Sequence, residues 1–353
     1  MPPSGGRFRD GEDVMPVAEL KTTYLGLELK NPLIAGASLL TSGMESLERM
    51  ERAGAGAVVA ASLFEEQIAI QSDRQEDLLM GYDNREQEEM GVFPGMAYRG
   101  PEDHLAWVRK AADRLSIPVI ASLNAFSGKV WPVWGRRLED SGAAALELNF
   151  YASPSDPGVS GQSMEDGQAR VVEEVKSAVS IPVSVKLSSF YTNPLHAVKR
   201  LEDAGADGFV LFNRFLQPDL DPEEGKSVFR FDLSERWENR LPLRFIALLA
   251  GKIRGSLCAS TGIHTASDGA KMILAGASAF QMVSGLYLGG IGSAADILSG
   301  LSSWMDGKGY ASLDQFRGAM SEKSLGDPFA WKRAQYVRIL MESGSSVGKY
   351  PLG

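Results

Sequence analysis

The sequence is poor in residues that bind metals through sulfur or imidazole. Its 353 residues include one cysteine, Cys258, and three histidines, His104, His196 and His264. A lone cysteine forms no disulfide within the chain and supplies no Cys-ligated zinc or iron–sulfur site by itself. The histidines are scattered and lack the spacing of metal ligands. We therefore expect no metal site from this chain.

Long apolar runs and an excess of positive charge are also lacking. No run approaches the roughly 20 residues of a membrane span, and residues 1–20 contain no apolar core of a signal peptide. The 36 Lys and Arg residues are outnumbered by 45 Asp and Glu residues, for a formal net charge of −9. A nucleic-acid-binding protein needs a basic face. We expect a cytoplasmic protein that has neither a nucleic acid nor a membrane as its partner.

What the sequence does contain is a repeat of helix-like and strand-like segments. Four similar stretches, such as "EDSGAAALELNF" and "EDAGADGFVLFN", place a Gly near a helix end and then enter an apolar run. Near-continuous apolar runs are typical of parallel strands buried on both faces, and amphipathic segments separate most of them. The eight runs are Pro32–Ala37, Ala57–Ser62, Pro118–Asn124, Ala145–Phe150, Pro182–Ser188, Gly208–Asn213, Ser256–Thr261 and Ala279–Ser284.

Eight strand–helix units predict an α/β fold, a (β/α)8 TIM barrel, with an open doubly wound sheet as the alternative. Residues 20–32 alternate like a β-hairpin that could close the bottom of the barrel. Long connections follow strands 2 and 6, at about 64–101 and 214–240, and we expect them to shape the substrate site. We expect a disordered segment at 1–18, the barrel at 19–340 and a tail at 341–353.

Polar side chains stand where the predicted strands end, which is the active-site face of such a barrel. Ser and Asn are also common turn residues, so each has a structural alternative. Lys186 is different, because an unpaired lysine is costly to bury in a strand; we expect it to meet a ligand anion or a cofactor. The strand-end residues are Ser38, Ser62, Asn124, Asn149, Lys186, Asn213, Thr261 with Gly262, and Ser284 with Gly285.

The last two strand ends predict a phosphate site. Gly262 lies at a strand end just before a helix-like segment, and Ser284 and Gly285 lie at the next strand end. In this fold the loops after strands 7 and 8 bind phosphate through backbone N–H groups and a helix N-terminus. We therefore expect a phosphorylated ligand or cofactor.

Four segments together resemble the dihydroorotate dehydrogenase family, whose members are FMN-containing (β/α)8 barrels. The segments are "TTYLGLELKNPLIAGAS", "ELNFYASPSD", "VKLSS" and "STGIHTASDGAKMILAGASAFQMVSGLY". The resemblance covers roughly residues 19 to 340. It implies an FMN-dependent oxidoreductase that acts on a CH–CH bond, most simply oxidising (S)-dihydroorotate to orotate in pyrimidine biosynthesis. It also implies a homodimer with a small-molecule substrate.

The resemblance implies roles for the strand-end residues. Lys186 would lie by the N1/C2 edge of the flavin, where its charge would stabilise the anionic reduced form. Asn149 would lie between flavin and substrate. The other implied cofactor-binding residues are Ser38, Ser62, Gly262, Val283, Ser284 and Gly285, and the other substrate residues are Asn124, Asn213 and Arg214.

Ser153, immediately before Pro154, corresponds to the catalytic base of the family. It would take a proton while hydride passes from the adjacent carbon to flavin N5. A serine is a poor base in water, so it needs a proton relay or a hydrogen-bonded water. The alternative is that Ser153 merely begins a turn with Pro154.

The sequence departs from the family pattern mainly where the substrate would bind. The loop between Asn149 and Pro154 is one residue longer, with Tyr151 and Ala152 where smaller or reactive residues are usual. Ala61 stands where many members carry lysine, and Arg214 where a small hydroxyl residue is usual. Ser155 replaces an asparagine, and "MGVFPGMAYRGP" is no clean match to the substrate segment. Arg214 could pair with a substrate carboxylate or recruit a different acid.

Three alternatives to dihydroorotate oxidation remain open. One is a related flavoenzyme with another cyclic, dihydropyrimidine-like substrate, which the departures favour. Another is a barrel that binds flavin without turnover. The third is an FMN-free sugar-phosphate enzyme, for which Glu65 is the nearest strand-end carboxylate. The sequence leaves the electron acceptor open, since the chain carries no iron–sulfur ligands of its own.

Overall fold

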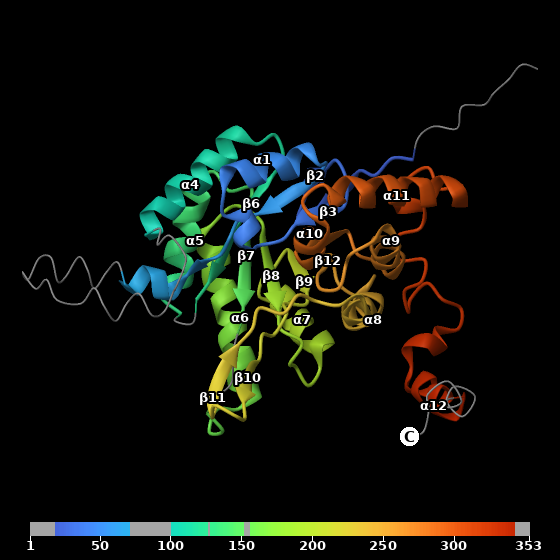
Figure 1. Cartoon of the computed structure of the whole chain (residues 1–353). Helices are drawn as coiled ribbons and strands as arrows, with labels where there is room; N and C mark the ends of the chain where they lie inside the picture. Colours follow the sequence, from blue (N-terminus) through green and yellow to red (C-terminus); the bar gives the residue numbers. More distant parts are fainter. Residues whose placement is uncertain (1–17, 71–99, 126–127, 152–155, 343–353) are drawn as a thin grey trace, which may run out of the picture.

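The computed structural model describes residues 18–70, 100–125, 128–151 and 156–342. Eight parallel strands close a barrel in the order β3-β4-β6-β7-β8-β9-β12-β13, and β13 pairs with β3. The (β/α)8 fold predicted from the eight apolar runs is therefore confirmed (Figure 1). A short extra strand, β5 (Leu63–Phe64), pairs with the end of β6. The barrel strands are β3 (Leu33–Ala35), β4 (Ala57–Val59), β6 (Val119–Asn124), β7 (Ala145–Phe150), β8 (Val183–Leu187), β9 (Gly208–Leu211), β12 (Ser256–Ala259) and β13 (Ala279–Met282).

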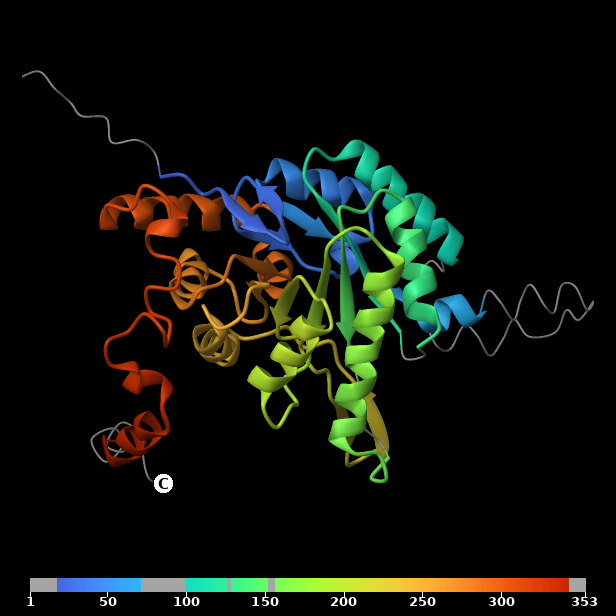
Figure 2. The ribbon, with the colours of Figure 1, turned by 180° about the vertical axis from the view of Figure 1, so that it is seen from behind.

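Helices surround the barrel on its outside, except α12, which lies apart from it (Figure 1 and, from behind, Figure 2). Their apolar faces repeat every three to four residues, as in α5, which buries Trp131, Trp134 and Leu138. The helices are α1 (Met44–Arg52), α4 (Pro101–Arg114), α5 (Val130–Asp140), α6 (Gly161–Ala178), α7 (Pro194–Asp203), α8 (Arg240–Leu249), α9 (Ala266–Ala275), α10 (Ser284–Gly289), α11 (Ser293–Lys308) and α12 (Arg333–Glu342).

Local sequence signals set the ends of α9, which matters for the site described below. Thr265 is its N-cap and forms a capping box with Asp268. Gly276 is the C-cap of the helix. Its φ of 120° is left-handed and suits a residue without a Cβ. The loop that precedes α9 is thereby held tightly against the helix.

The predicted N-terminal hairpin, β1 (Thr22–Tyr24) and β2 (Leu27–Leu29), closes the amino end of the barrel. Tyr24 is fully buried and clusters with inward side chains of the barrel such as Val210. The Leu25 N–H donates to Ser256 Oγ at 3.0 Å, at the first residue of β12. Because these contacts are at the amino ends of the strands, the opposite end is left for a site.

The hairpin also connects the beginning of the described chain to its last third. Thr22 Oγ1 donates to the Ser278 carbonyl at 2.8 Å and lies 2.9 Å from Nη2 of Arg317, which donates to it. The Glu19 N–H donates to the Ala311 carbonyl at 2.8 Å. Residues that are 256 and 295 positions apart in sequence are thus joined at one edge of the barrel.

The connection after β9 is long, as predicted, and contains a second hairpin. Its strands β10 (Pro218–Asp221) and β11 (Lys226–Phe229) pair antiparallel, and the short 3-10 helix η2 (Arg236–Asn239) leads into α8. Figure 1 shows this hairpin projecting beyond the barrel. Most of the long connection after strand 2 lies outside the described residues.

Two predicted segments lie almost wholly outside the described residues, namely 1–18 and 341–353. Of these, the structure describes only Ala18 and the last two residues of α12. No helix in the described ranges has the length and apolar character needed to cross a membrane. The cytoplasmic location stays a prediction.

Candidate functional site

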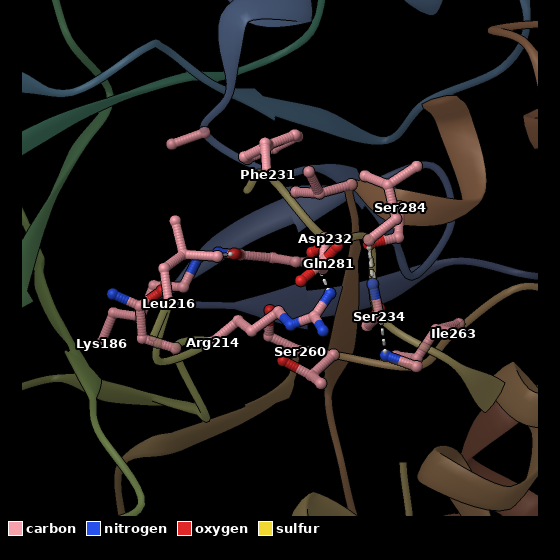
Figure 3. A pocket seen from close by; sticks show the side chains of 16 residues that line it. Lys186, Arg214, Leu216, Phe231, Asp232, Ser234, Ser260, Ile263, Gln281 and Ser284 are labelled. Atoms are coloured by element: carbon pink, nitrogen blue, oxygen red, sulfur yellow. Dashed lines mark hydrogen bonds between the residues drawn. The ribbon is translucent and has the colours of Figure 1, made fainter. Parts of the chain in front are cut away.

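A pocket opens at the carboxyl ends of β8, β9, β12 and β13 (Figure 3). This is the end of the barrel opposite the N-terminal hairpin, and the end where barrel enzymes place their active sites. The long connection after β9 forms one wall through Leu216 and Phe231. The predicted site residues that line it are Lys186, Asn213, Arg214, Gly262, Val283 and Ser284.

Three predicted asparagines form an amide cluster at the carboxyl ends of β6, β7 and β9. Asn213 Nδ2 donates to Asn149 Oδ1 at 2.7 Å, and Asn124 Nδ2 donates to the Asn149 carbonyl at 3.3 Å. Asn149 is paired in register with Lys186 on β8. The cluster therefore lies beside the lysine, and its amides can both donate to and accept from a bound ring.

Lys186 is almost fully buried, with 5% of its surface exposed, and it has partners that the sequence did not reveal. Its Nζ donates to Gln281 Oε1 at 3.0 Å and lies 3.8 Å from Glu147 Oε1. Gln281 Nε2 in turn donates to Glu147 Oε2. The signal for Glu147 was its spacing, because it lies two residues before Asn149 and so shares the inward face of β7.

Ser234, in the long connection after β9, joins the two predicted phosphate-binding strand ends. The Gly262 N–H donates to Ser234 Oγ at 3.1 Å, and both the N–H and the hydroxyl of Ser234 lie 2.9 Å from Ser284 Oγ (Figure 3). Sequence reasoning missed Ser234 because it follows no strand and belongs to no periodic segment. These groups form a cradle of small polar groups and N–H donors, which we call the Gly262–Ser284 cradle.

Gly262 in this cradle and Gly285 directly behind it leave no room for a Cβ. Gly262 has φ 72°, and a Cβ there would lie 2.6 Å from the backbone nitrogen of Asn239. A Cβ on Gly285 would lie 2.8 Å from the Ile263 carbonyl oxygen. Backbone N–H groups freed from side-chain bulk in this way are typical of phosphate sites. The cradle therefore fits a phosphate group such as that of FMN, and Lys186 places a cation in the same pocket.

Asp268 stabilises the segments that carry the Gly262–Ser284 cradle. Its carboxylate accepts hydrogen bonds from Nε and Nη2 of Arg236 at 3.0 and 3.1 Å, from Asn239 Nδ2 at 3.1 Å, and from the N–H groups of His264 and Thr265. Burial raises the pKa of Asp268, but the hydrogen bonds, above all those from Arg236, outweigh it and hold the pKa below its ordinary value.

Arg214 lines the pocket, but its guanidinium already has partners within the long connection after β9. Its Nη1 donates to the Asp232 carbonyl, and its Nη2 lies 3.8 Å from Glu238 Oε2. A substrate carboxylate would therefore compete with Glu238 for the guanidinium.

Five predicted site residues that the structure describes do not line this pocket, namely Asn124, Asn149, Ser38, Ser62 and Gly285. Ser62 Oγ is 2.8 Å from Ser122 Oγ, and Ser38 caps the 3-10 helix η1 (Leu39–Thr41). Gly285 packs behind the cradle rather than lining the pocket. Ser153 lies outside the described residues, so its role as base stays a prediction.

Tyr151 directly precedes the segment that contains Ser153. It contacts the long connection after β9, which forms one wall of the pocket. Its ring stacks on Phe215 with centroids 5.2 Å apart, and its hydroxyl accepts from the Leu216 N–H at 3.2 Å.

In the described ranges, no group of three or more His, Cys, Asp or Glu side chains is arranged to hold a metal ion.

Comparison with known proteins identifies the family. The sequence model described as dihydroorotate dehydrogenase matches residues 19–305. The chain is 27% identical over 311 residues to the dihydroorotate dehydrogenase B (NAD(+)) catalytic subunit of Thermoplasma acidophilum, covering 86% of this chain and 99% of that protein. It is 28% identical over 311 residues to the protein of the same name from Pyrococcus abyssi, covering 85% and 98%.

A third relative carries a different acceptor in its name. The putative dihydroorotate dehydrogenase A (fumarate) of Aeropyrum pernix is 26% identical over 310 residues, covering 85% of this chain and 97% of that protein. The family match confirms the predicted enzyme class, an oxidoreductase acting on CH–CH bonds. This chain, with its closed barrel and its strand-end pocket, belongs to the dihydroorotate dehydrogenase family.

Proposed function

We propose that this protein binds FMN and oxidises dihydroorotate to orotate. One observation carries the proposal: in a chain of this family, a buried lysine and a glycine-lined cradle open into one pocket at the strand ends. A cation suits the ring of a flavin that becomes negative on reduction, and the cradle suits its phosphate.

The residues that would hold the cofactor follow from this arrangement. The N–H groups of Gly262, Val283 and Ser284 would bind the phosphate, with Ser234 giving up its bond from Gly262 when phosphate arrives. Lys186 would lie at the edge of the flavin ring. When bound, FMN supplies the hydride acceptor of the reaction.

The amide cluster would bind and orient the substrate. Asn149 and Asn213 already share a hydrogen bond, so each has an amide group fixed in direction and further donor or acceptor capacity for a cyclic imide. Ser153 Oγ would accept the proton that leaves the substrate ring, provided that a neighbouring group or water relays it onward.

The structure favours one second candidate, oxidation or reduction of a neutral, dihydropyrimidine-like ring. Besides Lys186, Arg214 is the cation among the described lining residues that could bind the carboxylate of dihydroorotate, yet Glu238 and the Asp232 carbonyl already engage it. A neutral ring would leave these contacts intact. A barrel that binds flavin without turnover is the outcome in which neither ring reduces the cofactor.

The relatives differ in the electron acceptor that their names give. The name of the Thermoplasma acidophilum protein gives NAD(+), and that of the Aeropyrum pernix protein gives fumarate. We infer that any route through an iron–sulfur cluster would require another subunit, because the chain has one cysteine, Cys258, which is buried. A homodimer of this chain is part of the same proposal.

The experiment is an anaerobic visible spectrum of the purified protein, reconstituted with FMN and then mixed with dihydroorotate. We expect flavin absorbance that bleaches on addition. Flavin that stays oxidised with dihydroorotate but is reduced by a dihydropyrimidine would favour the second candidate. A protein that takes up no FMN would contradict the proposal.

A further inference from the structure

The barrel interior contains two buried polar side chains, Glu147 and Gln281, that have no part in the proposed binding of FMN or substrate. Glu147 is 1% exposed, on β7, and Gln281 is 1% exposed, on β13 at the far side of the barrel. Glu147 points inward because Ala145, two residues earlier, belongs to the barrel's interior cluster. Lys186 and Gln281 line the pocket, whereas Glu147 does not. Glu147 is therefore connected to the pocket through its contacts with these two neighbours.

The amide of Gln281 orders the three side chains. Its nitrogen donates to Glu147 Oε2 and its oxygen accepts from Lys186 Nζ at 3.0 Å. A rotated amide would turn its nitrogen to the ammonium and its oxygen to the carboxylate, so both contacts would become repulsive. Only one orientation is compatible with a charged pair, and this orientation fixes where the Lys186 ammonium lies.

Glu147 also opposes the charge of Lys186. The two charged groups are 3.8 Å apart in a water-poor interior, where charges are weakly screened. Among the described residues, Glu147 Oε1 accepts no hydrogen bond, and Gln281 donates to the other oxygen, so Lys186 is the cation that faces this carboxylate. The group as a whole is close to neutral, although the cation is the part that reaches the pocket.

We infer that Glu147 is a positioning residue that, together with Gln281, holds Lys186 at the pocket and limits the positive charge presented to a bound cofactor. The part concerning the cofactor rests on the proposed function, namely FMN binding. A flavin gains negative charge on reduction, so a less neutralised Lys186 would favour the reduced form. Glu147 thereby lowers the reduction potential of the bound flavin.

The test is the midpoint potential of bound FMN in Glu147→Gln and Gln281→Met. Glu147→Gln keeps an oxygen that can accept from Gln281 but removes the charge, so we expect a more positive midpoint potential. Gln281→Met removes both hydrogen bonds and leaves the carboxylate, so Lys186 loses its fixed position and FMN binds less tightly. The same potential in Glu147→Gln as in the wild type, with FMN bound to both, would overturn the electrostatic role.

Glu202→Gln is the matched control. Glu202 is also a buried carboxylate, 7% exposed, but it accepts the N–H groups of Arg254 and Gly255 just before β12, at the opposite end of the barrel. We expect it to reduce stability without moving the flavin potential. An equal shift in Glu202→Gln would show that any lost buried carboxylate acts in this way, and would overturn the inference.

A double-mutant cycle in the protein without FMN separates this inference from the proposed function. Urea unfolding of Glu147→Gln, Lys186→Met and the double variant measures the coupling of the two side chains with no cofactor present. We expect the double variant to be less destabilised than the sum of the single variants. Additive effects would overturn the positioning role, whereas failure to bind FMN, with coupling intact, would refute only the proposed function.

Discussion

Replacing Asp268 by asparagine tests whether the long connection after β9 is held to the phosphate loop as the structure shows. The carboxylate accepts from Arg236 and Asn239 of that connection, and from the N–H groups of His264 and Thr265 before α9. Both of its oxygens face donors only. An amide would turn an NH2 group toward some of them, whichever way it is oriented.

The expected loss is about 3 kcal/mol of unfolding free energy. Removing one partner of a buried charged pair costs about 3–5 kcal/mol. We take the lower end because the Arg236 side chain is 55% exposed and water can replace its lost partner, whereas Asp268 is 1% exposed. With an m-value of about 3 kcal/mol/M, this corresponds to a shift of about 1 M in the urea midpoint.

The pH dependence of this loss has a defined sign. The pKa of Asp268 in the folded protein lies below its ordinary value, while in the unfolded chain it is about 3.9. The carboxylate therefore stabilises the fold fully when the pH is above the pKa of the unfolded chain. This contribution disappears as the pH falls through the folded-state pKa. The difference between wild type and Asp268→Asn should be constant near neutral pH and shrink below about pH 4.

The assay is urea unfolding followed by circular dichroism at several pH values. Asp306→Asn, at an exposed position of α11, serves as the control and should change the midpoint little. If Asp268→Asn and Asp306→Asn unfold alike at neutral pH, the carboxylate does not tie the connection to the loop, and the reasoning is refuted.

Three further predictions concern the pocket. Ser153→Ala should slow bleaching of bound FMN by dihydroorotate by about 10²–10⁴-fold while FMN still binds, and unchanged stopped-flow rates would exclude Ser153 as the base. Gly285→Ala should weaken FMN binding in fluorescence titration and destabilise the fold by about 1–3 kcal/mol, because its Cβ would lie 2.8 Å from the Ile263 carbonyl oxygen; wild-type affinity would show that the loop can shift. Arg214→Gln should raise KM for dihydroorotate by about 10–100-fold with kcat little changed if the guanidinium binds the substrate carboxylate, and an unchanged KM would favour the neutral-ring candidate.

The sequence was sufficient for the barrel because parallel strands buried on both faces need apolar runs. All eight runs contain a barrel strand, and the hairpin at 22–29 lies at the predicted end. Lys186 was recognisable as a charge in an apolar run. Its partner Gln281 was not, because a single amide in a strand is as compatible with a turn or an edge as with the interior.

The rest of the site depends on contacts between segments distant in sequence. Ser234 reaches the cradle from a connection without periodicity, and Gln281 meets Glu147 from 134 residues away. The engagement of Arg214 by Glu238 likewise depends on how that connection folds back. Side-chain spacing along one element could reveal none of these.

The contacts of the N-terminal hairpin have a consequence for how the chain folds during synthesis. Thr22 has its partners at Ser278 and Arg317, and Glu19 pairs with residue 311, so these bonds span nearly the whole chain. The hairpin strands β1 and β2 can make these bonds only after the segment up to Arg317 has been synthesised. Contacts so distant in sequence are slow to form. We therefore expect the hairpin to close the amino end of the barrel late in folding, so that the apolar side chains it covers, such as Val210, stay open to water until then.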